Sequence, residues 1–164
     1  PDFVLADEPT TALDVVVQKE ILKLLMRLQE EHENSLVVVT HDMGVHYQIT
    51  DRMGVMYSGN MVEISDTEDI FTNALHPYTK MLVDALPKVG DSTRKVGIQG
   101  RPPSLLNPPR GCRFAERCPN VMSTCHLTAP AFVEVEPGRH VACYLYDEVV
   151  EKTKELEAMA HETA

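Results

Sequence analysis

The sequence has little of what a membrane span, a secreted precursor or a nucleic-acid binder requires. No apolar stretch approaches the roughly 18 residues of a membrane-spanning helix, and no signal-peptide pattern precedes the first predicted strand. Its 15 basic residues are outnumbered by 25 acidic ones, which gives a formal net charge of −10. A general nucleic-acid binder presents a basic face, so we expect no nucleic-acid partner.

A glycine-rich phosphate loop is also absent. The pattern Gly-x-x-x-x-Gly-Lys-Ser/Thr occurs nowhere in the 164 residues. The printed chain therefore lacks the backbone cradle that such a loop provides for nucleotide phosphates. Its hydrophobic content of 43% is nevertheless ample for a packed core, which favours a soluble protein of one domain or of a half-domain with an appendage.

An apolar run near the start ends in two adjacent carboxylates: Phe3-Val4-Leu5-Ala6-Asp7-Glu8-Pro9-Thr10. Successive side chains of a strand point to opposite faces, so Asp7 and Glu8 can take different roles. One can hold Mg²⁺ beside a triphosphate while the other orients or deprotonates an attacking water. The alternative is a buried strand followed by solvated acids, and the octet alone does not decide between them.

A second strand signal follows at a distance typical of a βαβ crossover. Asp14 is a good N-cap for a predicted helix over residues 15–32, and residues 36–40 then predict a buried parallel strand that ends at His41. Such a crossover places Glu8 and His41 at the same edge of one sheet. Ligands of open α/β sheets bind at this carboxyl edge.

Further elements are predicted along the chain. The apolar face of the helix over residues 15–32 is predicted to comprise Val17, Ile21, Leu24, Leu25 and Leu28. We expect a short helix over 43–50, a hairpin of strands 52–57 and 61–65, a helix reaching residue 73 behind a capping box at 65–68, and a helix over 77–86.

The order of these motifs closely resembles that of the ATP-binding subunits of ABC transporters. Their Walker B strand matches residues 3–10, their D-loop matches Thr11-Ala12-Leu13-Asp14, and their switch histidine matches His41. The resemblance implies that Asp7 holds Mg²⁺, Glu8 polarises the hydrolytic water and His41 hydrogen-bonds the γ-phosphate of ATP. It also implies that Asp14 communicates across a dimer of ATPase subunits.

Two features of this family are missing from the printed residues. Neither the phosphate loop nor the Leu-Ser-Gly-Gly-Gln signature occurs, and the chain opens with Pro1-Asp2 directly on a predicted core strand. We therefore expect the carboxyl-terminal half of a longer ATPase, which by itself does not hydrolyse ATP. The predicted fold class is α/β, the C-terminal part of a P-loop NTPase parallel-sheet core followed by a small, loop-rich extension with four cysteines.

The four cysteines lie in a proline-rich stretch with few long apolar elements, at Cys112, Cys118, Cys125 and Cys143. Disulfides seldom persist in the reducing cytosol that an ATPase subunit faces. Four thiolates in a weakly cored module suggest a metal, but their spacing matches neither the usual zinc knuckle nor the compact ferredoxin run. The spacing alone leaves open a thiolate-bound metal, disulfides or free thiols.

A second resemblance covers this region. It resembles the carboxyl-terminal extension of oligopeptide/dipeptide importer ATPases at Leu75-His76-Pro77-Tyr78-Thr79-Lys80, Gly100-Arg101-Pro102-Pro103, Gly111-Cys112-Arg113-Phe114, Arg117-Cys118-Pro119 and His140-Val141-Ala142-Cys143. The resemblance implies a [4Fe–4S] cluster on Cys112, Cys118, Cys125 and Cys143, with Zn²⁺ as the alternative. Nickel-type importers share parts of this extension, so it indicates the subfamily better than the cargo.

Three segments are predicted from these patterns. Residues 1–86 are expected to be the C-terminal half of the nucleotide-binding domain, residues 87–146 the Pro/Cys-rich extension, and residues 147–164 an acidic helical tail. His76, which precedes Pro77, is expected to cap or pack at a helix start. His32, His46 and His161 are read as surface or groove residues. His126 and His140 could substitute as zinc ligands, but four cysteines already fill a tetrahedral site.

The resemblance implies an ATPase that energises import of oligopeptides or dipeptides from the cytoplasmic side of the membrane. Expected partners are a second ATPase subunit, integral membrane permease subunits and, indirectly, an extracytoplasmic peptide-binding protein. Three alternatives remain at this point: a metal-binding interaction module with a vestigial ATPase half, a nickel-type importer, and an ABC ATPase of repair or translation. The importer-like extension argues against the last.

Overall fold

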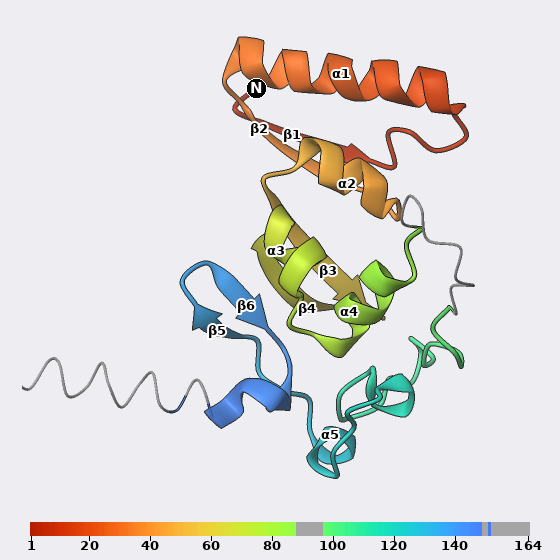
Figure 1. Cartoon of the computed structure of the whole chain (residues 1–164), viewed down its shortest axis with the longest axis vertical. Coiled ribbons are helices and arrows are strands. Elements are labelled where there is room, and N and C mark those ends of the chain that lie inside the picture. The colour runs from red at the N-terminus through yellow and green to blue at the C-terminus, as the bar shows by residue number, and fades with distance from the viewer. Residues whose placement is uncertain (88–96, 149–150, 152–164) are drawn as a thin grey trace, which may run out of the picture. The chain divides into compact units, whose positions relative to one another are not determined.

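The computed structural model describes residues 1–87, 97–148 and 151 (Figure 1). The chain divides into two compact units, Pro1–Asp51 and Arg52–Ala164. Most of the predicted acidic tail lies outside the described residues. Within the described part of the chain, no helix combines the length and apolar character needed to cross a membrane.

The first unit contains β1 (Phe3–Asp7), α1 (Val15–His32), β2 (Ser35–Val39) and α2 (Met43–Ile49). β1 and β2 pair in parallel, from Phe3 opposite Ser35 to Asp7 opposite Val39. Asp14 caps α1 by accepting hydrogen bonds from the backbone N–H groups of Val16 and Val17, at 2.9 and 3.0 Å. The strand–helix–strand crossover and its cap are thus confirmed, with α1 at the predicted bounds.

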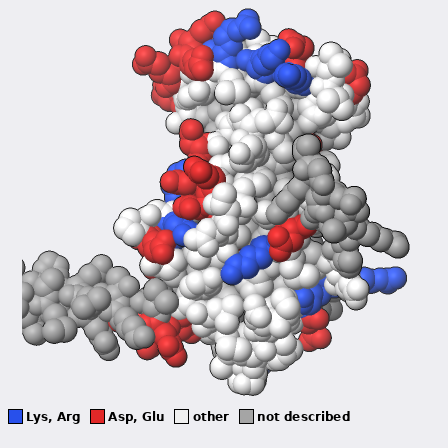
Figure 2. Space-filling view, in the orientation of Figure 1, with Lys and Arg blue, Asp and Glu red and all other residues white. Residues whose placement is uncertain are grey.

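Burial in the first unit differs from the prediction. The buried residue of α1 is Leu22, whereas Val17, Leu24 and Leu28 of the predicted apolar face are 41%, 45% and 39% exposed. β1 and β2 alternate between exposed and more buried positions, so they are not the strands buried on both faces that the sequence predicted. Two strands offer too narrow a surface to cover the whole apolar arc of an 18-residue helix. Charged side chains of both signs gather over α1 (Figure 2).

The second unit is built on an antiparallel sheet in the order β3-β4-β6-β5. Its elements are β3 (Arg52–Tyr57), β4 (Asn60–Asp66), α3 (Thr67–Asn73), α4 (Pro77–Asp84), the 3₁₀ helix η1 (Ala115–Arg117), α5 (Thr124–Leu127), β5 (Val133–Glu136), β6 (Arg139–Val141) and the 3₁₀ helix η2 (Tyr144–Tyr146). β6 comes from the predicted extension but pairs with β4, so this sheet joins strands from both sides of residue 87.

The β3–β4 hairpin and the start of α4 agree with the sequence, whereas the capping box at the start of α3 is wrong. Asp66 occupies the N-cap position of α3 and makes no side-chain capping hydrogen bond. Ser65, the predicted cap, is fully buried and pairs with Met53 within the hairpin. Because Ser65 is held in the strand, the helix begins one residue later than a capping box would require.

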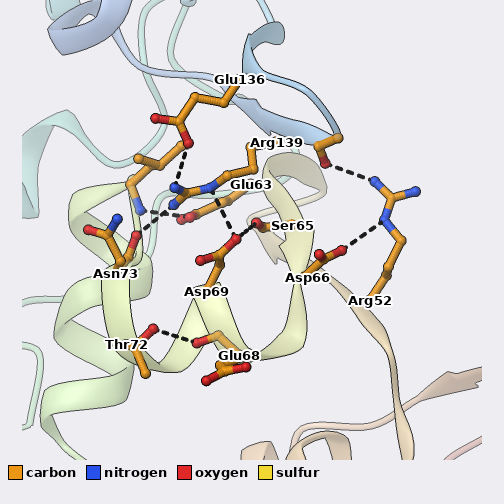
Figure 3. A network of polar contacts seen from close by, with 12 residues as sticks. Arg52, Glu63, Ser65, Asp66, Glu68, Asp69, Thr72, Asn73, Glu136 and Arg139 are labelled. Atoms are coloured by element: carbon orange, nitrogen blue, oxygen red, sulfur yellow. Dashed lines mark hydrogen bonds and ion pairs between the residues drawn. The ribbon is translucent and has the colours of Figure 1, made fainter.

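Arg139 connects the β5–β6 hairpin to α3 (Figure 3). Its guanidinium donates hydrogen bonds to the Glu136 carboxylate at 2.8 Å and to the Asn73 carbonyl at 2.7 Å. Its Nε lies 3.7 Å from an oxygen of Asp69. Only 9% of the Arg139 side chain is exposed, so these contacts compensate a charge that is largely removed from water.

Glu63 forms a second buried polar link, between β4 and the segment that joins α3 to α4. Its carboxylate is fully buried and accepts hydrogen bonds from the backbone N–H groups of Leu75 at 2.7 Å and His76 at 2.9 Å. Such charge-assisted bonds satisfy two donors that would otherwise lie unpaired in the core. Glu63 therefore fixes the point where α4 begins.

Candidate functional site

The first unit brings Glu8 and His41 together at the carboxyl edge of its parallel strands. The Glu8 backbone N–H donates to the Val39 carbonyl at 2.8 Å and so extends the β1–β2 pairing by one residue. The chain then turns, with Glu8 at a φ of 47°, in the left-handed region that residues with a Cβ seldom adopt. His41 Nδ1 lies 2.9 Å from Glu8 Oε1. The predicted meeting of these two side chains is observed.

Thr11 is a third member of this site that sequence reasoning did not single out. Its hydroxyl donates to Glu8 Oε2 at 2.7 Å, so each oxygen of the carboxylate has a protein partner. The Thr11 backbone N–H also donates to the Glu8 carbonyl at 3.2 Å, which closes a turn after the strand. The sequence did contain a signal for this contact. Thr11 carries a hydroxyl three positions after the acid at the strand end, and a turn at that spacing brings the hydroxyl back to the acid.

The two titrating groups of this site support each other electrostatically. Hydrogen bonds from Thr11 and His41 lower the pKa of Glu8 from 4.5, and the Glu8 carboxylate raises the pKa of His41 from 6.5. The contribution of Glu8 to the stability of the folded state is present above pH 4.5, and it is lost as the pH falls through the lowered pKa of Glu8. The contribution of His41 to the stability of the folded state is present below pH 6.5, and it is lost as the pH rises through the raised pKa of His41. The charged pair is therefore complete between these two ordinary values.

The other two predicted acids occupy different surroundings. Asp7 is the exposed last residue of β1, one position before Glu8. Asp14 is engaged as the N-cap of α1, where its Oδ1 accepts both backbone hydrogen bonds and its Oδ2 is left for other partners. Mg²⁺ is commonly held by one or two carboxylates together with substrate phosphates, so the single exposed carboxylate of Asp7 fits that chemistry.

The four cysteines of the second unit line one small cavity between the loop at residues 112–118, α5 and η2. Close backbone approach brings the loop and α5 together, since the Cys112 N–H donates to the Cys125 carbonyl at 2.7 Å. A Cβ on Gly111 would lie 2.2 Å from that same carbonyl oxygen. Only glycine fits at this approach, which explains why Gly111 precedes Cys112.

The thiols at this cavity are not arranged as a metal site. Within the described residues, no group of three or more His, Cys, Asp or Glu side chains is placed to hold a metal ion. Burial raises the pKa of Cys112 and Cys118, and it raises that of Cys143 to about 11. The structure gives no support to the predicted [4Fe–4S] cluster or zinc site.

The Glu8–His41–Thr11 site has the chemistry of water activation. It presents an ionised carboxylate of fixed orientation and an imidazole whose Nδ1 faces that carboxylate, with the His41 side chain 82% exposed. A carboxylate can accept a hydrogen bond from water and then its proton, while an exposed imidazole can donate to an oxyanion. These groups lie at the strand edge where ligands of parallel α/β sheets bind.

Comparison with known proteins gives matches over most of the chain. Residues 62–125 match the family model described as oligopeptide/dipeptide transporter, C-terminal region. The putative oligopeptide transport ATP-binding protein YkfD of Bacillus subtilis is 42% identical over 158 residues, which is 94% of this chain and 48% of that protein. The dipeptide transport ATP-binding protein DppD of Caldanaerobacter subterraneus is 44% identical over 149 residues, 90% of this chain and 46% of that protein.

A third relative is the oligopeptide transport ATP-binding protein OppD of Salmonella typhimurium, 41% identical over 145 residues, 88% of this chain and 43% of that protein. The chain thus spans about half the length of the curated relatives it matches. Its strand-end Glu8–His41 pair lies in the first unit, outside the residues of the family model, which fall wholly in the second. Together these matches support the interpretation of the chain as a C-terminal fragment similar to the ATP-binding proteins of oligopeptide and dipeptide transporters.

Proposed function

We propose that this chain is part of an ATPase subunit that energises the import of oligopeptides or dipeptides. The observation that carries the proposal is the 2.9 Å contact between Glu8 and His41 at the carboxyl edge of parallel strands. The relatives are named as ATP-binding proteins of oligopeptide and dipeptide transport, which favours a peptide cargo over nickel. Nothing in these matches favours a vestigial ATPase half.

Glu8 would orient the attacking water and receive its proton. The water oxygen forms a bond to the γ-phosphorus of ATP, the bond from that phosphorus to the oxygen of ADP breaks, and the water's proton passes to the Glu8 carboxylate. Thr11 and His41 hold the carboxylate in one orientation. Because they also lower its pKa, we expect Glu8 to act more through orientation than as a strong base.

His41 would report the presence of the γ-phosphate. Its Nδ1 is engaged by Glu8, so Nε2 is the ring atom available to donate to a phosphate oxygen. Proximity to Glu8 raises the pKa of His41 and so increases the fraction of the charged form, which favours an anionic partner. Loss of the phosphate after hydrolysis would release this contact while leaving the Glu8 contact in place.

Asp7 is the residue that we propose to hold Mg²⁺, either directly or through water. When bound, that ion would neutralise charge on the phosphates of ATP. Asp14 is proposed to communicate across a dimer of ATPase subunits through Oδ2, since Oδ1 is committed to the cap of α1. The proposed setting is the cytoplasmic side of the membrane, with permease subunits as direct partners and an extracytoplasmic peptide-binding protein as an indirect one.

The exposed apolar faces of the first unit fit this proposal. Phe3 and Leu5 of β1 are 56% and 60% exposed, and Val37 and Val39 of β2 are 43% and 49% exposed. Parallel sheets occur almost only with both faces covered. We propose that these faces are covered in a full-length subunit of the size of the relatives, which are about twice as long as the matched segment.

Calorimetry with Mg·ATP tests the proposal on two proteins. The full-length subunit should bind ATP and hydrolyse it, and Glu8→Gln should retain binding while losing turnover. The 164-residue chain, which has no phosphate loop, should show no heat of binding at physiological ATP concentrations. Clear micromolar binding by the 164-residue chain would overturn our interpretation of this site as half of a nucleotide site.

The [4Fe–4S] cluster and its zinc alternative remain predictions from the family resemblance. Analysis of anaerobically purified protein for iron, sulfide and zinc tests them, with the four single Cys→Ser variants as controls. Four irons and four sulfides per chain, lost in each variant, would support the cluster. A protein free of both iron and zinc would contradict both predictions.

A further inference from the structure

A second cavity in the Arg52–Ala164 unit has no part in the proposed ATPase chemistry. It has a volume of about 340 Å³, and it lies beside the β3–β4 turn, the N-cap residue of α4 and the loops at 112–114 and 129–132. This volume is within the range of small-molecule sites, roughly 300–1,000 Å³. None of Asp7, Glu8, Thr11 or His41 lines it.

The charge of the lining is opposite to that of the chain as a whole. The sequence holds 25 acidic residues, yet no Asp or Glu lines this cavity, and Arg113 is its one side chain with a fixed charge. Arg113 donates one of its five N–H groups to the Ser58 carbonyl, so the rest of the guanidinium fork is left for a ligand. Gly59 leaves room for this group, because a Cβ there would lie 3.2 Å from an Arg113 nitrogen.

His76 supplies a second donor. The ring is only 1% exposed, and its Nδ1 accepts a hydrogen bond from the Tyr78 backbone N–H at 3.0 Å. Burial lowers the pKa of His76 to about 4, so at neutral pH the ring is neutral and carries its single proton on Nε2. No described residue accepts a hydrogen bond from Nε2. Because His76 also lines the cavity, its Nε2–H is a donor that a ligand can use.

Apart from Asn60, the remaining wall is mostly apolar and includes packed aromatic rings. Tyr57 and Phe114 meet edge-to-face with ring centroids 5.2 Å apart, and Phe132 stacks on His140 at 5.6 Å. Met61 and Val62 of β4 also line the cavity. Rings held in this way give a shaped apolar surface at little entropic cost to a ligand.

We propose that this cavity binds a small carboxylate that carries an apolar side chain, a free amino acid or the carboxyl-terminal residue of a short peptide. The Arg113 guanidinium and the His76 Nε2–H would hold the carboxylate, and the aromatic wall with Met61 would receive the side chain. The proposal uses no residue of the ATPase site, so it stands or falls separately from the proposed hydrolysis of ATP.

Calorimetry on the full-length subunit with leucine, the dipeptide Ala-Leu and leucinamide tests the ligand class. Leucinamide keeps the apolar side chain but has no carboxylate, so it should bind at least about 10-fold more weakly than leucine, the loss expected for one charge-assisted interaction. Binding of leucine alone identifies free amino acids as the ligand class. Binding of Ala-Leu, alone or with leucine, shows that the carboxyl-terminal residue of a peptide fits.

Two variants and a matched control locate the binding. Arg113→Gln keeps a donor for the Ser58 carbonyl but removes the charge, and it should weaken binding by about 10- to 100-fold. Ala129→Trp adds bulk at an exposed lining position and should abolish binding without disturbing the core. Arg110→Gln changes an exposed arginine outside the lining and should leave binding unchanged. Equal binding of leucinamide and leucine, or no binding of leucine or Ala-Leu at about 10 mM, would overturn the proposal.

Discussion

The two units of the chain differ in content: the first carries the Glu8–His41 site, and the second carries most of the buried apolar residues. In the first unit the buried apolar residues are Leu22, Val38 and Val45. Among its described residues, the second unit buries twelve: Met53, Val55, Tyr57, Val62, Ile70, Ala74, Leu75, Phe114, Ala115, Cys125, Val135 and Val141. Yet the first unit holds Glu8, His41 and Thr11, the groups suited to act on a water molecule. A site can therefore have fixed local geometry on elements whose apolar surface is largely uncovered.

Local hydrogen bonds account for this contrast. In the first unit, three local features fix the site. β1 pairs with β2, the Asp14 cap fixes the start of α1, and Thr11 binds Glu8 across a short turn. In the second unit, buried polar links join separate elements: Glu63 binds the backbone before α4, and Arg139 binds Asn73, 66 residues away in the chain. We expect the first unit to open easily by local unfolding in the 164-residue chain, and we expect the second unit to resist such unfolding.

The largest effect is expected at the site of the first unit that we propose to act on water. Glu8→Gln in the full-length subunit removes the proton acceptor but preserves the size of the side chain, so turnover should fall by about two to four orders of magnitude while ATP binding persists. Steady-state hydrolysis and ATP binding are the measurements. The matched control is Glu20→Gln, an exposed acid of α1 paired with Lys23, which should hydrolyse ATP normally. Near-normal hydrolysis by Glu8→Gln would remove Glu8 from the mechanism.

The second unit should respond most strongly to a change at Glu63. Glu63→Gln retains one acceptor oxygen for the two backbone donors of Leu75 and His76, which leaves a buried N–H facing an amide group. Denaturant unfolding should show a loss of about 2–3 kcal/mol. Glu68→Gln, at an exposed position of α3, serves as the control and should change stability little. A Glu63→Gln protein as stable as the control would show that this buried link is dispensable.

A smaller effect is expected from Thr11, a positioning residue for Glu8. Thr11→Val removes the hydroxyl that donates to Oε2, so the pKa of Glu8 should rise and turnover should fall by several-fold, about the worth of one hydrogen bond. The acidic limb of the pH–rate profile should move to higher pH, a result that a purely structural role would not give. Thr11→Ser keeps the donor and should restore the wild-type profile.

The smallest expected change concerns the titration of His41. Its pKa should lie above 6.5 in the wild-type chain, because the Glu8 carboxylate favours the charged ring, and it should return toward 6.5 in Glu8→Gln. NMR titration of the imidazole protons measures both values. Glu20→Gln, which leaves the Glu8–His41 contact in place, is the control and should leave the His41 titration unchanged. An unchanged His41 titration would mean that the pair does not persist in solution.

Local patterns of the sequence predicted the geometry of the site well. The spacing from Glu8 to His41 defined a crossover, and a crossover permits one relative placement of its two strand ends. The N-cap roles of Asp14 and His76 also followed from residue type and position. In each case, the deciding contacts lie close in sequence or follow from the pairing of one strand with the next.

Long-range contacts were beyond this approach. Nothing near β4 indicated that β6 would pair with it, so the sheet that crosses residue 87 was missed, as were the buried roles of Glu63 and Arg139. The predicted apolar face of α1 included residues that are exposed, because periodicity identifies apolar positions without showing which other elements cover them. For the cysteines, spacing indicated that they belong together but not their protonation state.

Hydrogen exchange tests the contrast between the units most directly, when it is measured by mass spectrometry on both the 164-residue chain and the full-length subunit. In the 164-residue chain, amides of β3 and β4 should exchange slowly while those of β1, α1 and β2 exchange rapidly, because few apolar contacts oppose their opening. In the full-length subunit, β1, α1 and β2 should become as protected as β3 and β4. Equal protection of both units in the 164-residue chain would contradict our proposal that the exposed faces of the first unit are covered in a longer subunit.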